Sequence, residues 1–143
     1  MERVYCKSMN TELKIRTIDI PRIEDPRGNL AVIEKEVLPF SIARVYYLFD
    51  VPSGAYRGGH AHKECLELLI AVSGSFEVVL DNGTNKERVM LNNPTKGLLI
   101  PVNMWRELEN FSSGSVCLVL ASHAYDEADY IRDYVDFTAL MNE

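Results

Sequence analysis

The stretch that decides the fold runs from Gly54 to Gly74 and reads GAYRGGHAHKECLELLIAVSG. Its apolar second half is typical of a β-strand, and successive side chains of a strand point to opposite faces. His60 and His62 are two residues apart, so on a strand they point the same way, about 6–7 Å apart. The whole chain contains three histidines. Two of them on one face of one strand indicate a functional pair.

The rest of the chain predicts an all-β domain. Short apolar segments separated by turn residues are typical of a sandwich or barrel. The predicted strands are residues 14–20, 29–35, 43–50, 59–63, 67–72, 75–80, 87–91, 97–101, 105–110 and 115–121. Asp81-Asn82-Gly83 predicts a hairpin turn, because Asn and Gly accept the positive φ that such turns need. Ten strands favour a jelly-roll or cupin-type barrel, with a mouth into which alternate strand residues project.

The C-terminal tail has a different pattern. Apolar and aromatic residues recur at helical spacing from Asp126 onward, and acidic residues there suit a helix N-terminus. The recurring residues are Tyr130, Ile131, Tyr134, Phe137 and Leu140. We predict one terminal α-helix, with its aromatic stripe packed on the barrel as core.

Composition limits the function classes. The 143 residues, of which 47% are hydrophobic, form one domain spanning residues 1–143. The formal charge of -6 argues against nucleic acid or an anionic membrane as partner. Arg44, Arg57 and Lys63 could still hold a small phosphate ligand. Three scattered cysteines and an N-terminus without an apolar signal core predict a soluble, cytoplasmic protein.

The histidine segment resembles the first sequence motif of the cupins, in which glycine, His-x-His, glutamate and glycine follow at set spacings. Gly54, His60, His62, Glu67 and Gly74 all fall in register. In metal-binding cupins the two histidines and the glutamate are three of four ligands, and imidazole and carboxylate suit Fe, Mn, Zn or Ni.

The second cupin motif decides the metal prediction. Its usual proline and asparagine match Pro101 and Asn110, but its histidine position holds Arg106. A guanidinium stays protonated, cannot coordinate a cation and repels one at close range. We therefore predict a metal-free pocket, with Arg106 either pointing at a substrate oxygen or pairing with Glu67.

A metal-free pocket with two histidines suits enolisation of a carbonyl compound. A base near neutral pH must remove the proton next to the ketone, which histidine can do. The carbonyl oxygen then needs a hydrogen-bond donor. Arg44 and Tyr46 share one face of the predicted strand 43–50, and either could be that donor.

The chain as a whole resembles the sugar-nucleotide 3,4-ketoisomerases, over roughly residues 12–137. The matching strings are DPRGNL (25–30), PFSIARVYY (39–47), RGGHAHK (57–63), VLAS (119–122) and YDEADYIRDY (125–134). The resemblance implies dTDP-4-keto-6-deoxyglucose as substrate, a 3-keto-6-deoxy sugar as product and no cofactor. It also implies a role in deoxysugar biosynthesis for bacterial surface polysaccharide, such as lipopolysaccharide O-antigen or S-layer glycan, and a homodimer with exchanged strands.

The resemblance also implies roles for residues. His60 would remove the C3 proton, while His62, Tyr46 and Arg44 would polarise the carbonyl, hold the base or carry protons. Substrate contacts are expected from Arg27, Arg57, Lys63, Glu67, Trp105 and Arg106. Relatives commonly carry glutamine at the position of Glu67, so a carboxylate there keeps metal binding open. The pattern does not choose between galacto and gluco configuration at C4, nor settle which histidine is the base.

Three alternatives stay open at this point. A dTDP-sugar 3,5-epimerase is a metal-free cupin for the same substrate class, but it inverts carbons beside the ketone without moving it. A metal-dependent cupin oxygenase or isomerase would use the histidine pair as ligands. A non-catalytic cupin would only bind the sugar.

Overall fold

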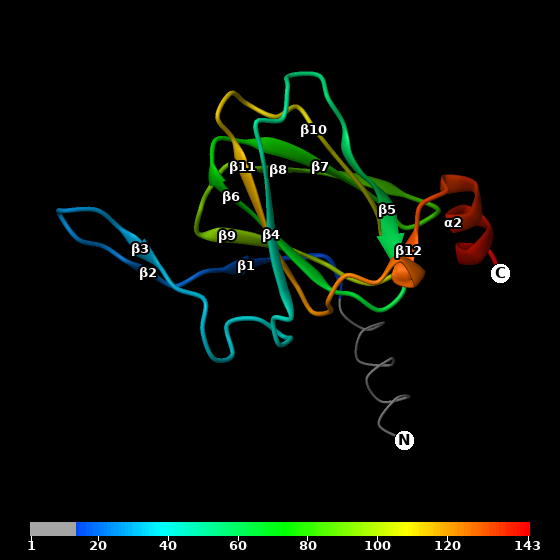
Figure 1. The fold of residues 1–143 in the computed structure, drawn as a ribbon, viewed down its shortest axis with the longest axis horizontal. Coiled ribbons are helices and arrows are strands. Elements are labelled where there is room, and N and C mark those ends of the chain that lie inside the picture. The colour runs from blue at the N-terminus through cyan, green and yellow to red at the C-terminus, as the bar shows by residue number, and fades with distance from the viewer. Residues whose placement is uncertain (1–13) are drawn as a thin grey trace.

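The computed structural model describes residues 14–143 as a β-rich domain with one short α-helix (Figure 1). The strands are β1 (Arg16–Asp19), β2 (Arg22–Ile23), β3 (Leu30–Ala31), β4 (Arg44–Phe49), β5 (Arg57–His62), β6 (Glu67–Ser73), β7 (Phe76–Asp81), β8 (Lys86–Leu91), β9 (Lys96–Ile100), β10 (Trp105–Glu109), β11 (Val116–Ala121) and β12 (Tyr130–Ile131). A 3₁₀ turn, η1 (Glu127–Asp129), precedes β12, and α2 (Tyr134–Met141) follows it. Each predicted strand overlaps an observed one.

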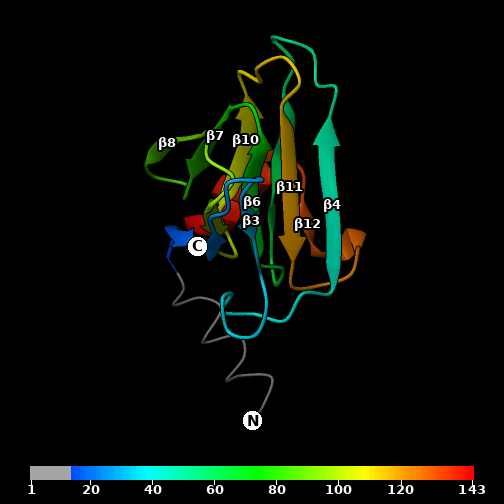
Figure 2. The same ribbon diagram turned by 90° about the vertical axis from the view of Figure 1, so that its left-hand side faces the viewer.

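Two five-stranded antiparallel sheets form the body of the domain. One has the order β1-β9-β6-β11-β4 and the other β12-β5-β10-β7-β8. They face each other as two layers, with β4 at the outer edge of its sheet (Figures 1 and 2). This is the cupin-type jelly roll that the strand pattern predicted.

The core lies between the two sheets. Leu69 and Val119 from one sheet and Val78 and Leu108 from the other belong to one buried apolar cluster. Gly74, in the turn from β6 to β7, has φ +65°, and a Cβ there would lie 2.9 Å from the Cα of Ser115. Only glycine fits that turn without strain, so the last glycine of the histidine segment has a structural reason.

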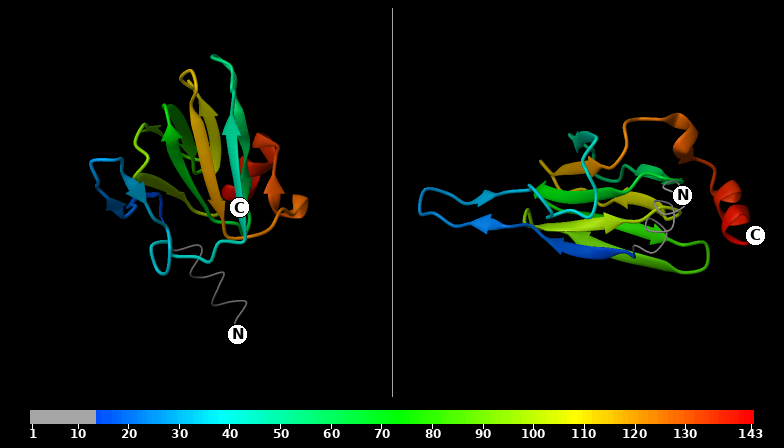
Figure 3. Two further views of the ribbon diagram at one scale, coloured as in Figure 1. Left: turned by 60° about the vertical axis from the view of Figure 1, so that its left-hand side comes forward. Right: turned by 90° about the horizontal axis from the view of Figure 1, so that it is seen from below.

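A two-stranded arm projects from one end of the body. It consists of β2 and β3, and it extends away from the sheets (Figures 1 and 3). The predicted strand 29–35 is here reduced to Leu30–Ala31, paired with Arg22–Ile23. Ile23 and Leu30 are both more than half exposed.

The C-terminal segment corrects the prediction of one helix from Asp126. Tyr130 and Ile131 form β12, which pairs with β5 through Tyr130↔His62 and Ile131↔Ala61, and the helix begins only at Tyr134. The Asp133 side chain accepts a hydrogen bond from Asp136 N and caps the helix there. The backbone N–H and C=O groups of this segment form hydrogen bonds with β5, in place of those that a longer helix would have formed. Among residues 14–143, no helix is long and apolar enough to cross a membrane.

Candidate active site

A cleft of about 410 Å³ opens between the two sheets, lined by polar and aromatic side chains. Arg44 and Tyr46 on β4 and Glu67 on β6 line one wall. His60 on β5 and Arg106 on β10 line the other. The sequence predicted all five as site residues, and the fold brings them together.

His60 enters the cleft because β5 is irregular just before it. Gly58 has φ +83°, and the β5–β10 register shifts between Arg106 and Glu107, which is a β-bulge. His60 Nε2 is buried and has no hydrogen-bond partner within residues 14–143. Burial first, and then the charge of Arg106, lower the pKa of His60 to about 3. At neutral pH this imidazole is therefore unprotonated.

Glu67 is held between two donors. Arg106 Nη1 lies 2.6 Å from one carboxylate oxygen, and the Tyr46 hydroxyl donates to the other at 2.6 Å. Burial would raise the pKa of Glu67, but the neighbouring His62 and the charge of Arg106 outweigh it and hold the pKa well below its usual range. Arg106 was predicted either to point at a substrate oxygen or to pair with Glu67, and the structure shows the pairing with Glu67.

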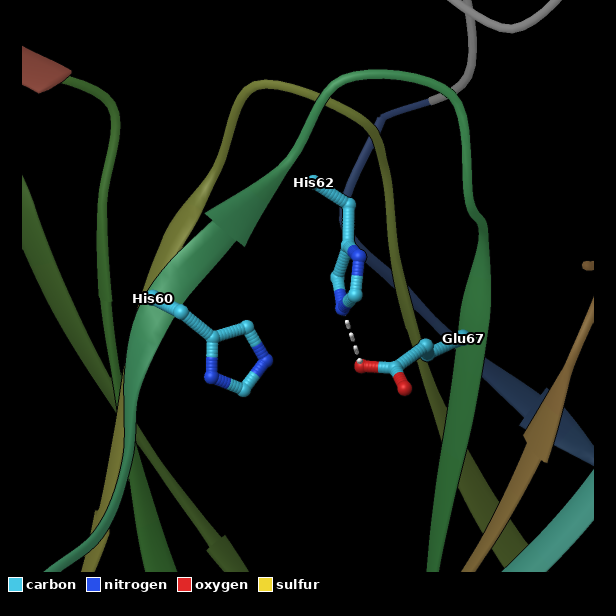
Figure 4. A group of neighbouring side chains, drawn as sticks. All are labelled: His60, His62 and Glu67. Atoms are coloured by element: carbon cyan, nitrogen blue, oxygen red, sulfur yellow. Dashed lines mark ion pairs between the residues drawn. The ribbon is translucent and has the colours of Figure 1, made fainter. Parts of the chain in front are cut away.

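His62 lies beside His60 on the same side of β5, but deeper in the protein. The two rings are 4.9 Å apart and meet edge to face. Figure 4 shows both rings directed toward Glu67, and His62 Nε2 is 3.5 Å from Glu67 Oε1. The other ring nitrogen, Nδ1, lies 2.9 Å from Asp129 Oδ2. His62 thus spans two carboxylates rather than lining the cleft.

Asp129 is a site residue that the sequence analysis missed. Besides His62, its carboxylate accepts hydrogen bonds from the backbone N–H groups of Lys63, Glu64 and Cys65. Burial would raise the pKa of Asp129, but His62 and the Glu64 N–H outweigh it and lower the pKa. The ionised carboxylate therefore ties the C-terminal segment to the turn after β5 and orients the His62 ring.

Tyr130 and Arg132 also line the cleft, and neither was predicted as a site residue. The Tyr130 ring lies 5.0 Å from His60 and 4.4 Å from His62. The Arg132 guanidinium lies 4.2 Å from the centre of the Tyr130 ring. The prediction that the aromatic residues of the tail form the packed face of a helix is therefore wrong for Tyr130. Its strand pairing with His62, which no local pattern reveals, places it in the site.

The remaining predicted substrate contacts are divided. Arg57 lines the cleft. Lys63 instead donates to the Ala128 carbonyl, and Trp105 packs under α2 beside Tyr134. Arg27 lies in the turn of the projecting arm, where it pairs with Asp25. Lys63, Trp105 and Arg27 therefore lie outside the lining of this cleft in the single chain.

The three side chains that hold a metal in metal-binding cupins come together here but do not fit that use. His60, His62 and Glu67 each offer a ligand atom within 4.8 Å of the others. Both oxygens of Glu67, however, already accept hydrogen bonds from Arg106 and Tyr46. A cation at this point would displace these bonds and stand beside a buried guanidinium, which repels it.

A protein family and a known enzyme match most of this chain. The family described as "FdtA: WxcM-like, C-terminal" matches residues 13–142. A TDP-4-oxo-6-deoxy-alpha-D-glucose-3,4-oxoisomerase from Aneurinibacillus thermoaerophilus is 44% identical over 123 residues, covering 85% of this chain and 88% of that protein.

Solved structures show the same likeness. A 3,4-ketoisomerase from Helicobacter canadensis is 43% identical with a TM-score of 0.88, covering 92% of this chain and all of that one. A mutant of the 3,4-ketoisomerase QdtA from Thermoanaerobacterium thermosaccharolyticum, in complex with TDP-4-keto-6-deoxyglucose, is 39% identical with a TM-score of 0.88, covering 90% of this chain and 94% of that one.

Proposed function

The chain belongs to the family described as "FdtA: WxcM-like, C-terminal", and on this basis we propose that it converts TDP-4-keto-6-deoxyglucose into a TDP-3-keto-6-deoxyhexose. Such an enzyme is a sugar-nucleotide 3,4-ketoisomerase. The observation that carries the proposal is His60, a neutral imidazole whose buried Nε2 has no partner among residues 14–143 and which lines the cleft. That atom is available to take a proton from a bound sugar.

The reaction needs a base, a donor for the carbonyl oxygen and no outside oxidant. His60 removes the proton at C3 of the sugar, next to the C4 ketone. The electron pair forms a C3–C4 double bond, and the negative charge that develops on the C4 oxygen is held by donors in the cleft. A proton then returns at C4, the C4 oxygen gains a proton and the C3 hydroxyl loses its own, so the ketone has moved by one carbon. The hydrogen count of the sugar is unchanged.

Positive charge in the cleft supports a nucleotide-linked substrate. Arg44, Arg57 and Arg132 all line it, in a protein whose formal charge is -6. Guanidinium groups suit a diphosphate because they present several donors in a fixed fork. The arginines thus concentrate a local positive potential where a TDP moiety needs it.

We expect the reaction to proceed without a metal, because Arg106 and Tyr46 already bind both oxygens of Glu67. The test is elemental analysis of purified protein together with activity before and after dialysis against EDTA. Full activity after dialysis is expected. Loss of a stoichiometric metal together with activity, and recovery on adding it back, would contradict metal independence.

An NMR time course on TDP-4-keto-6-deoxyglucose tests the proposed activity. The expected result is a ketone that migrates from C4 to C3, and the same spectra give the configuration of C4 in the product. A ketone that stays at C4 beside an inverted C3 or C5 would show a 3,5-epimerase. An unchanged sugar bound by the protein would show a non-catalytic cupin.

The projecting arm supports a homodimer with exchanged strands. Ile23 and Leu30 on the arm are exposed, and so is the outward face of the edge strand β4, formed by Val45, Tyr47 and Phe49. Isolated edge strands and apolar faces are usually covered. A second copy of the chain would cover both. Arm exchange would carry Arg27 toward the partner's cleft, where it could make the substrate contact expected from the family resemblance.

Light scattering after size-exclusion chromatography tests this assembly. The wild type is expected at twice the chain mass of 16.2 kDa. Ile23→Asp with Leu30→Asp should give the monomer, whereas Val135→Asp, at an exposed position on α2, should leave the dimer intact. A wild-type protein that elutes as a monomer would contradict the exchange.

We further propose that the enzyme acts in deoxysugar biosynthesis in the cytoplasm. A 3-keto-6-deoxy sugar nucleotide is an intermediate suited to deoxysugar biosynthesis. Cys65 and Cys117 are free, buried thiols, which supports a reducing compartment such as the cytoplasm.

A further inference from the structure

Tyr46 does not have a free hydroxyl to offer a substrate. Its O–H donates to Glu67 Oε2 at 2.6 Å. Burial, and then the Glu67 carboxylate, raise the pKa of Tyr46 far above its usual range. A hydroxyl whose proton is bound by a carboxylate is a poor donor to a second acceptor. The reaction proposed above therefore needs its donor from another side chain of the cleft.

Tyr130 has the free hydroxyl that Tyr46 lacks. The alternation along β12 sends Ile131 into the apolar cluster with Ala61 and Phe137 and leaves Tyr130 facing the cleft, where it is part of the lining. Its oxygen only accepts, from Arg44 Nη1 at 3.4 Å and Nη2 at 3.5 Å. Within residues 14–143, its proton has no acceptor.

The surroundings of Tyr130 are those of a proton donor. Its ring lies 5.0 Å from that of His60, so its hydroxyl and the base line the same cleft at short range. The Arg44 guanidinium stands beside the oxygen and would stabilise the negative charge left after proton transfer. Arg44 Nε is itself buried without a partner in the described chain. Both groups are thus incomplete without a ligand.

We propose that Tyr130, supported by Arg44, is the catalytic residue that donates a hydrogen bond and then its proton to the C4 oxygen of the sugar. This deepens the proposed isomerase function and rests on it. As His60 takes the C3 proton, the C–H electron pair forms the C3–C4 double bond. The carbonyl π pair moves to the C4 oxygen, which takes the Tyr130 proton, and an enediol results.

The second half of the reaction restores the enzyme. The Tyr130 oxygen takes the proton of the C3 hydroxyl, and the C3 oxygen forms the new carbonyl. The electron pair of the double bond takes a proton at C4 from protonated His60, which returns to the neutral form. One proton has left C3 and one has arrived at C4, and one has moved from the C3 oxygen to the C4 oxygen. No electron enters or leaves the sugar.

Tyr130→Phe tests the assignment, since it removes only the hydroxyl. Turnover would be followed by NMR, exchange of the C3 hydrogen in D₂O by loss of its proton signal, and TDP affinity by calorimetry. Because C3 deprotonation needs the oxygen donor, turnover and exchange should both fall about 100- to 1,000-fold. The dissociation constant for TDP should stay within about twofold, since the hydroxyl contacts the sugar only.

Tyr125→Phe is the matched control. Tyr125 precedes β12 and also lies near Arg44, but its hydroxyl bonds to the exposed Glu127. It should keep wild-type turnover. A Tyr130→Phe enzyme with wild-type turnover and exchange would overturn the proposal, as would an equal loss in Tyr125→Phe. A wild-type protein that never moves the ketone would instead refute the isomerase function.

Discussion

Arg106 Nη1 and Glu67 Oε1 lie 2.6 Å apart, and each side chain is 1% exposed. The pair joins β10 of one sheet to β6 of the other at the back of the cleft. In a metal-binding cupin the corresponding positions hold two ligands. Here a guanidinium and a carboxylate stand at these positions and neutralise each other.

Arg106→Met should therefore destabilise the fold. Removing one member of a buried ion pair leaves the other charge uncompensated, which costs about 3–5 kcal/mol of unfolding free energy. Urea denaturation measures it. Arg88→Met is the control, because Arg88 is exposed and bonds to Glu77 and Glu109 at the surface. Its loss should be much smaller, because solvent-exposed salt bridges contribute little to stability. Equal losses of unfolding free energy in the two variants would contradict a larger contribution from the buried pair.

His60→Asn should abolish turnover without abolishing binding. Loss of a general base lowers kcat by about 10²- to 10⁴-fold. Calorimetry should still detect TDP binding, because the arginines of the cleft are unchanged. His123→Asn is the control, since His123 bonds to Ser122 on an exposed loop. Wild-type turnover in His60→Asn would remove His60 from the reaction.

The lowered pKa of His60 predicts how stability depends on pH. The pKa falls from 6.5 to about 3 on folding, so between these values the unfolded chain binds more protons than the folded one. His60 therefore makes stability fall as pH drops from 6.5 toward 3. His60→Gln should flatten this decline, by up to about 1.4 kcal/mol per pH unit. Denaturation of both proteins at several pH values gives the difference, and parallel curves would contradict it.

Asp129→Asn should weaken catalysis through His62. The amide keeps the size of the side chain but loses the charge that accepts the Nδ1 proton. A hydrogen bond to a charged group contributes about 1.5–3 kcal/mol, so kcat should fall roughly 10- to 150-fold. The Nδ1–H signal of His62 in a ¹H–¹⁵N spectrum should shift as well.

Asp126→Asn controls for the fold of the same segment. Asp126 accepts a hydrogen bond from Ala128 N at an exposed position. Its variant should keep both the turnover and the His62 signal. If Asp129→Asn lowers turnover while the His62 signal stays unmoved, the orienting role of Asp129 is wrong.

The local sequence was enough to predict the strands and the grouping of His60, His62, Glu67 and Arg106. Alternation along β5 puts His60 and His62 on one side, and Glu67 follows at a spacing that brings it opposite them. Arg106 occupies the position at which the second cupin motif usually has a ligand histidine, so the sequence predicted a guanidinium at that point of the site. These inferences succeed because they depend on strand periodicity and on the chemistry of single side chains.

The tail shows where such reasoning stops. Tyr130 and Ile131 match helical spacing, and nothing within their own segment says that they pair with β5. The pairing spans almost 70 positions of the chain, from His62 to Tyr130, and it brings Asp129 to the His62 ring. Backbone hydrogen bonding to a distant strand overrode the local pattern, as tertiary context commonly does.

The sequence by itself thus determined that this is a cupin-type domain with a histidine pair and an arginine in place of a metal ligand. The tertiary structure alone decided which hydroxyl is free. Tyr46 and Tyr130 are both tyrosines on strands beside the cleft, yet one proton is bound by Glu67 and the other has no acceptor in residues 14–143. The physical reason is that a hydrogen bond depends on where two distant side chains meet, which strand periodicity does not specify.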